Sequence, residues 1–183
     1  MPSYQFKIIL TGDEAVGKTS AVRRFVDGTF KESYKATLGF EVSVKAIICG
    51  SSSIVFSIFD VAGQQDFQGV RAGYYQGSFG FLLMFDLTNR ASFEHIPNWV
   101  DEIRAAEPNV PIILIGTKSD LPDPQVTPEE MAIACEIFEL QESIIASSKT
   151  GAGVDEMFNR IGNAIIASIN SKSQCNSKSM SQA

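Results

Sequence analysis

A short glycine-rich segment near the start of the chain has the composition of a loop that holds phosphate. Residues 12–19 read Gly-Asp-Glu-Ala-Val-Gly-Lys-Thr and match the pattern Gly-x-x-x-x-Gly-Lys-Ser/Thr at every fixed position. The glycines let the backbone pass close to phosphate oxygens, and the N–H groups at the start of the following helix favour anions. In such a loop Lys18 reaches the β- and γ-phosphates, and the Thr19 hydroxyl ligates Mg²⁺. The motif predicts a nucleotide site, whereas the alternative is a glycine turn before an ordinary helix.

A second segment could select the base of that nucleotide. Residues 117–120, Thr-Lys-Ser-Asp, follow an apolar run that reads as a strand. The Asp120 carboxylate can accept hydrogen bonds from N1–H and the exocyclic amine of guanine, and adenine has no such pair of donors. A backbone N–H in the later segment 147–149 could meet the guanine O6. The alternative is that Asp120 is an ordinary helix cap, which an aspartate after a strand often is. The segment 117–120 therefore indicates guanine binding only through its place in the order of motifs along the chain.

Four residues between these two motifs have the types needed to hold a metal ion and to activate water. Asp60 follows a predicted strand and can hold Mg²⁺ through water, while Gln64 can orient an attacking water. Gly63 can offer its N–H to the γ-phosphate. Thr37 lies in the long loop after the first predicted helix, where it can close over the same ion. The predicted metal residues are Thr19, Thr37 and Asp60, and the predicted catalytic residues are Gln64 and Lys18.

Short apolar runs alternate with helical patterns along the chain, which is typical of a layered α/β domain. The cluster Gly-Ser-Ser-Ser at 50–53 is short enough for a hairpin, so two strands are expected to pair antiparallel. The prediction is a six-stranded, mostly parallel sheet with one antiparallel strand and helices on both faces. The expected strands are 6–10, 40–48, 54–60, 79–85, 110–115 and 143–146, and the expected helices are 18–27, 91–106, 128–139 and 154–169.

The composition fits one water-soluble domain followed by a tail. The 183-residue chain is 44% hydrophobic and 20% charged, a balance that supports a single packed core. That domain is expected over residues 1–169, and residues 170–183 are small and polar, so a disordered tail is predicted there. A net charge of −6 without any basic run argues against nucleic acid as the main partner.

Cysteine usage and the two ends of the chain bear on location. Cys49, Cys135 and Cys175 are widely spaced, without a metal-ligand or disulfide pattern, which favours a reducing compartment. The sequence shows no secretory signal and no run that is apolar over the length of a membrane span. It also ends without a prenylation motif. A cytoplasmic, mainly soluble protein with no stable lipid anchor is therefore predicted.

Five motifs in one order, each where a strand passes into a loop, give the chain a family likeness. Over about residues 5–168 it resembles a small GTPase of the Ras superfamily, whose fold is the P-loop NTPase G domain. The resemblance implies a monomeric molecular switch that binds GTP or GDP with Mg²⁺ and slowly hydrolyses GTP to GDP and phosphate. By the same resemblance, Phe30 packs on the edge of the base and Tyr34 covers the phosphates. The nucleotide residues carried over are Gly12, Asp13, Glu14, Ala15, Val16, Gly17, Lys18, Thr19, Ser20, Phe30, Tyr34, Thr37, Gly63, Thr117, Lys118, Asp120, Ser147, Ser148 and Lys149.

Two resemblances leave the branch of the superfamily open. Residues 34–42 resemble the first switch segment of Ran, whereas residues 148–158 look more like Rab. The likeness implies a role in intracellular trafficking or transport signalling. It also implies effector proteins, an exchange factor and a GTPase-activating protein that bind through residues 31–45 and 61–78.

Glu14 and Ala15 depart from the family pattern, since Ras and Ran have glycines there. A side chain at Glu14 would stand beside the γ-phosphate, so slow hydrolysis and a weak response to an arginine finger are predicted. A carboxylate that turns to solvent is the alternative. Two rival functions are a GTP-bound scaffold impaired in hydrolysis and a P-loop small-molecule kinase, against which Asp120 argues. His95, the single histidine, shows no partner pattern, and no catalytic role is predicted for it.

Overall fold

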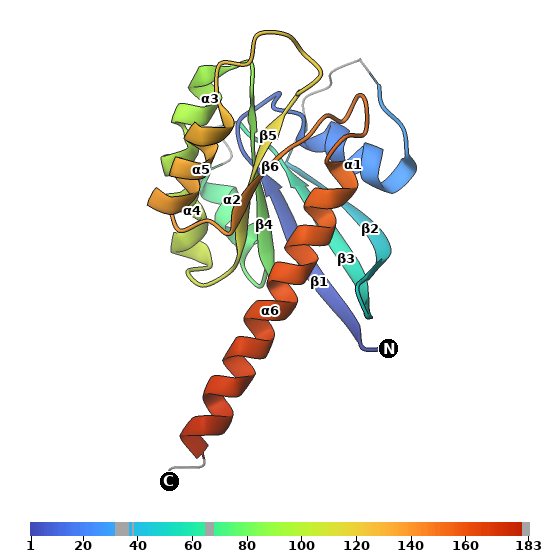
Figure 1. Cartoon of the computed structure of the whole chain (residues 1–183), viewed down its shortest axis with the longest axis vertical. Helices are drawn as coiled ribbons and strands as arrows, with labels where there is room; N and C mark the ends of the chain where they lie inside the picture. Colours follow the sequence, from blue (N-terminus) through green and yellow to red (C-terminus); the bar gives the residue numbers. More distant parts are fainter. Residues whose placement is uncertain (32–36, 38, 65–67, 181–183) are drawn as a thin grey trace.

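The structure, a computed structural model, is a single sheet with helices on both faces, and it describes residues 1–31, 37, 39–64 and 68–180 (Figure 1). The strands are β1 (Ser3–Thr11), β2 (Phe40–Cys49), β3 (Ser52–Val61), β4 (Gly80–Asp86), β5 (Ile112–Thr117) and β6 (Glu142–Ile145). Their order across the sheet is β2-β3-β1-β4-β5-β6. β2 runs antiparallel to β3, and the other neighbours pair in parallel. The predicted fold class is confirmed.

Two hydrophobic cores lie on opposite faces of the sheet, because successive residues of a strand point to opposite sides. The helices are α1 (Lys18–Asp27), α2 (Gln68–Tyr75), α3 (Arg90–Glu94), α4 (Ile96–Ala106), α5 (Pro128–Ile137) and α6 (Val154–Met180). Ile8 of β1 shares a core with Phe25 of α1 and Phe158 of α6, whose rings stack at 3.7 Å. Ile9 belongs to the core of α2, α4 and α5, which Figure 1 shows grouped away from α1 and α6.

Two helical features differ from the sequence prediction. The single helix expected over 91–106 is divided at His95 into α3 and α4, because Pro97 lies in the first turn of α4. A proline ring lacks an N–H and clashes with the preceding turn, so it ends one helix and begins another. α2 was not predicted, since it has only eight residues and two of them, Gly69 and Gly73, are glycines, which disfavour a helix.

The last helix ends later than the sequence predicted. α6 continues to Met180, past residue 170, where a disordered tail was expected. No glycine or proline interrupts residues 163–180, so each added residue extends the ladder of backbone hydrogen bonds. Within the described ranges, no helix has both the length and the apolar character that a membrane span requires.

The loops that follow the parallel strands meet at one edge of the sheet and position the site. The loop after β1 passes so close to β4 that a Cβ on Gly12 would lie 2.0 Å from the Met84 carbonyl oxygen. Gly12 also has a φ of +131°, which side chains rarely adopt. A Cβ on Gly63, after β3, would lie 2.5 Å from the backbone of the loop after β1. Both glycines therefore allow these loops to approach closely.

Candidate functional site

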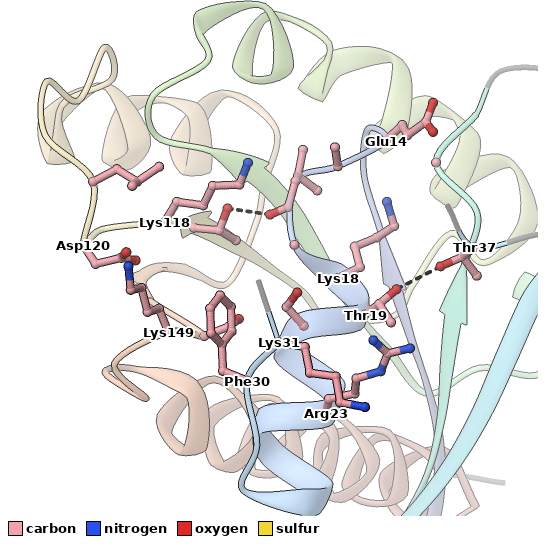
Figure 2. A pocket seen from close by; sticks show the side chains of 18 of the residues that line it. Glu14, Lys18, Thr19, Arg23, Phe30, Lys31, Thr37, Lys118, Asp120 and Lys149 are labelled. Carbon is pink, nitrogen blue, oxygen red and sulfur yellow. Dashed lines mark hydrogen bonds between the residues drawn. The ribbon is translucent and has the colours of Figure 1, made fainter. Parts of the chain in front are cut away.

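A cavity of about 340 Å³ opens above the start of α1, at the edge of the sheet where the strand-end loops meet (Figure 2). Its walls come from the loop after β1, from the loops around Thr37 and Gly63, and from the loops after β5 and β6. The lining residues are Glu14, Ala15, Val16, Gly17, Lys18, Thr19, Ser20, Arg23, Phe30, Lys31, Thr37, Gly63, Gln64, Thr117, Lys118, Asp120, Leu121, Ser148 and Lys149.

The phosphate loop holds one buried cation. Lys18, the first residue of α1, donates from Nζ to the carbonyl oxygens of Gly12 at 2.7 Å and Asp13 at 2.6 Å. Burial lowers the pKa of this ammonium to about 8, and the charges of Asp60 and Asp13 oppose the decrease. A cation whose charge is destabilised by burial favours an anionic ligand, so this end of the cavity suits phosphate groups.

The three predicted metal residues meet beside that lysine. The Thr19 hydroxyl lies 2.9 Å from the Thr37 hydroxyl and also donates to Asp60 Oδ2. Burial raises the pKa of the Asp60 carboxyl, and its other oxygen, Oδ1, has no hydrogen-bond partner among the described residues. Two hydroxyls and a carboxylate are hard oxygen donors of the kind that Mg²⁺ takes in proteins. The orphaned oxygen and the donor set therefore fit a magnesium ion.

At the opposite end of the cavity, a serine hydroxyl holds the carboxylate of Asp120. Ser147 Oγ donates to Asp120 Oδ1 at 2.5 Å. The ammonium of Lys118 pairs with Asp86 Oδ2 at 2.7 Å, and Lys118 lines the cavity with Asp120 and Phe30 (Figure 2). A held carboxylate in a cavity that is also lined by an aromatic ring and an alkyl stem suits a flat base with two adjacent donors.

Two side chains tie this base end to the phosphate loop and to α1. Thr117 is buried, and its hydroxyl oxygen lies 2.6 Å from the Val16 carbonyl oxygen and 2.8 Å from that of Phe85, so its single proton is shared between these two acceptors. Arg24 of α1 donates from Nε to the Ser148 carbonyl oxygen at 2.7 Å. The guanidinium also bonds the carbonyl oxygen of Lys149. The spacing between the phosphate end and the base end is therefore fixed by direct bonds between the loops.

The family follows from comparison with known proteins. Residues 7–167 match the profile of the Ras family. The chain belongs to the Ras family. Members are small GTPases, so this Ras-family protein is a GTP-binding switch with the fold described above.

Several relatives of this Ras-family protein carry Rab names. It is 39% identical to the Ras-related protein RABA4b of Arabidopsis thaliana, over 92% of the chain and 76% of that relative. It is 35% identical to Rab11C of Nicotiana tabacum, over 97% of the chain and 84% of the relative. It is 37% identical to Rab-1 of Theileria annulata, over 88% of the chain and 74% of that relative. These matches are consistent with the Rab side of the resemblance.

Most of the predicted nucleotide residues of this Ras-family protein line the cavity, and three others do not line it but bond to residues that do. Gly12 and Asp13 supply carbonyl oxygens to Lys18, and Ser147 supports Asp120. Tyr34 lies outside the described residues. Lys31, Leu121 and Arg23 also line the cavity but were not predicted. Arg23 stands four residues after Thr19, one helical turn on the same face of α1, and that spacing could have revealed it.

His95 has a partner that the sequence did not reveal. Its Nδ1 lies 2.7 Å from Asp13 Oδ2, and the other oxygen of Asp13 accepts a bond from Trp99 Nε1 at 2.8 Å. The Asp13 side chain therefore points to α4 and not into the nucleotide cavity.

An aromatic cluster of the exposed Phe40 and the half-buried Phe59 and Tyr74 joins β2, β3 and α2. The ring centroid of Phe40 lies 4.3 Å from that of Tyr74 and 5.9 Å from that of Phe59. Phe40 is 41% exposed. No motif in the sequence reveals this cluster, because its members come from three separate elements. They lie within or next to the ranges 31–45 and 61–78 predicted for partner binding.

Proposed function

We propose that this protein is a Rab-like switch that binds GTP and GDP together with Mg²⁺, hydrolyses GTP with the help of Gln64, and acts in intracellular trafficking. The observation that carries the proposal is the convergence of a phosphate loop, three oxygen donors and a held carboxylate on one cavity. The Rab names of the relatives support the branch. The cytoplasmic location and the monomeric state stay predictions.

In the proposed reaction the protein mainly positions groups and stabilises charge. Lys18 and the loop N–H groups bind the phosphate oxygens and stabilise the charge that develops on them. Thr19, Thr37 and Asp60 would hold Mg²⁺, which neutralises phosphate charge when it is bound. The Gln64 carboxamide orients the attacking water toward the γ-phosphate. Asp120 selects guanine, because adenine would leave its carboxylate without the paired donors.

A second candidate is a switch that stays in the GTP form for long periods. The observation that favours it is the hydrogen bond from Gln64 to Glu14, which engages the amide that the reaction needs. Regulation would then depend on nucleotide exchange more than on hydrolysis.

Partner proteins are proposed to bind through residues 31–45 and 61–78. The aromatic cluster supports this, because its exposed ring, Phe40, lies in the first of these ranges and packs on Tyr74 of the second and on Phe59. A pull-down with protein loaded with a non-hydrolysable GTP analogue, against the GDP form, should recover effectors. The Phe40→Ser variant should no longer recover effectors, although its affinity for nucleotide should be unchanged. Equal recovery by both nucleotide forms would contradict the proposed switch surface.

The binding proposal is tested by the affinity for GTP, GDP and ATP, each measured with Mg²⁺ and with EDTA. Guanine nucleotides should bind at least about a thousandfold more tightly than ATP, and EDTA should speed their release. Asp60→Ala should remove the effect of Mg²⁺, whereas the exposed Asp101→Ala should not. Equal affinities for ATP and GTP would contradict the guanine assignment.

A further inference from the structure

The single tryptophan of the chain stands between the phosphate loop and the loop that carries Gln64. Trp99 of α4 is 6% exposed and donates from Nε1 to Asp13 Oδ1 at 2.8 Å. On its other side, the guanidinium carbon of Arg71 lies 4.5 Å from the ring centroid. This is cation–π distance, and the contact is shielded from water. Trp99 thus contacts the phosphate loop through Asp13 and α2 through Arg71.

Arg71 extends this contact to the backbone of the Gln64 loop. Its Nη1 donates to the carbonyl oxygen of Gln64 at 2.6 Å and to that of Ala62 at 3.3 Å. Nε and Nη2 donate to the two carboxylate oxygens of Glu102 in α4, at 2.7 Å and 2.9 Å. The side chains of Arg71 and Glu102 are 4% and 10% exposed. A buried, bidentate pair fixes the guanidinium, so the Gln64 carbonyl that it binds is fixed as well.

In the phosphate loop, on the other side of Trp99 from Arg71, the Asp13 side chain is held by hydrogen bonds. Both of its carboxylate oxygens are engaged, one by Trp99 and one by His95. Its backbone carbonyl accepts the bond from the buried Lys18. A shift of the phosphate loop would therefore pull on the indole, and a shift of the indole would change its stacking on Arg71.

We propose that Asp13, Trp99 and Arg71 form a relay that positions Gln64 according to what the phosphate loop holds. None of the three enters the nucleotide cavity, so they are positioning residues and not catalytic ones. The relay rests on the proposed role of Gln64 in hydrolysis. Its effect is to fix the Gln64 backbone when the loop is loaded, because a displacement of about 1 Å at a reacting group can cost about a hundredfold in rate.

The first test breaks the relay at two points and measures single-turnover GTP hydrolysis. Asp13→Ala removes the acceptor for the indole, and Trp99→Phe keeps a ring under Arg71 but removes its N–H donor. Both should lower the rate about tenfold while GTP affinity changes less than about twofold. Asp13→Asn retains an oxygen that can accept from the indole, so it should recover most of the rate. Equal rates for Asp13→Ala, Asp13→Asn and wild type would overturn the proposal.

A matched pair of arginines separates positioning from general stability. Arg71→Gln should lower hydrolysis at unchanged GTP affinity, whereas Arg160→Gln, which removes an exposed arginine of α6, should not. Melting temperatures of both variants show whether either has lost its fold. A rate for Arg71→Gln equal to that of Arg160→Gln would overturn the relay.

The second test is spectroscopic and does not depend on hydrolysis. Trp99 is the only indole, so its emission should differ between the GDP form and the form loaded with a non-hydrolysable GTP analogue. Arg71→Gln should reduce that difference. An emission that does not depend on the nucleotide would overturn the relay. A different outcome is that Gln64→Leu hydrolyses GTP normally while the Trp99 emission still differs between the two nucleotide forms. The proposed role of Gln64 in hydrolysis would then be wrong, and the coupling between the phosphate loop and Trp99 would be retained.

Discussion

Gln64 donates a hydrogen bond from Nε2 to Oε1 of Glu14, at 3.1 Å, across the mouth of the nucleotide cavity. The amide proposed to orient the attacking water is thus engaged by a carboxylate of the phosphate loop. The same carboxylate adds negative charge beside the position expected for the γ-phosphate, and Lys18 offsets part of that repulsion. The side chain of Glu14 is directed to the outside of the loop, at the edge of the cavity (Figure 2).

Glu14→Gly should raise the intrinsic rate of GTP hydrolysis by about tenfold or more, because it frees Gln64 and removes the like charge. Single-turnover assays alone and with an activator measure this. Glu14→Gln is the matched control, since it keeps the size of the side chain and removes its charge. Comparable rates for wild type and Glu14→Gly under both conditions would mean that Glu14 is tolerated and the switch cycles normally.

Gln64→Leu should leave GTP and GDP affinity near wild type and lower turnover by roughly one to several decades, because only the orientation of water is lost. Nucleotide release rates and single-turnover hydrolysis, measured on the same preparation, separate the two effects. An unaltered hydrolysis rate would point to another water-positioning group.

Asp120→Asn should weaken GTP binding and shift preference toward xanthine nucleotides. The new amide can donate to the xanthine oxygen that replaces the guanine amine. Competition between GTP and XTP measures the shift, and Asp123→Asn, at an exposed aspartate of the same loop, provides the control. Unchanged GTP affinity in Asp120→Asn would show that the assignment is wrong.

Arg23→Ala should speed the release of GDP and GTP by about three- to tenfold at low salt, and by less at high salt. Arg23 lines the cavity beside Thr37 and Lys31 (Figure 2). Burial raises the pKa of the Asp60 carboxyl, and the charge of Arg23 opposes that rise, so the guanidinium acts at the predicted metal end. Arg160→Ala controls for net charge. Release rates equal to the control at low salt would mean that Arg23 does not contribute to nucleotide binding.

The phosphate loop and the base-reading segment could be predicted because each is contiguous. Glycine conformation, a helix start and a lysine at fixed spacing are properties of eight neighbouring residues, and they need no knowledge of the rest of the chain. The layered α/β fold was predictable for a similar reason, since apolar runs and turn residues act over short windows. Pro97 carried further local information that the single predicted helix over 91–106 did not take into account, since a proline marks the start of a helix and the structure has a break at His95.

Only the tertiary structure decided which distant side chains meet. Asp13 and His95 are 82 residues apart, and Glu14 and Gln64 are 50 apart, so no spacing rule connects them. Each pair depends on how α4 and the loop after β3 pack against the phosphate loop, and packing is set by the summed contacts of two cores. The sequence therefore determined the chemistry of the nucleotide site. The fold determined that Glu14 engages the Gln64 amide and that Trp99 joins the two loops, because these contacts exist only after the helices have docked on the sheet.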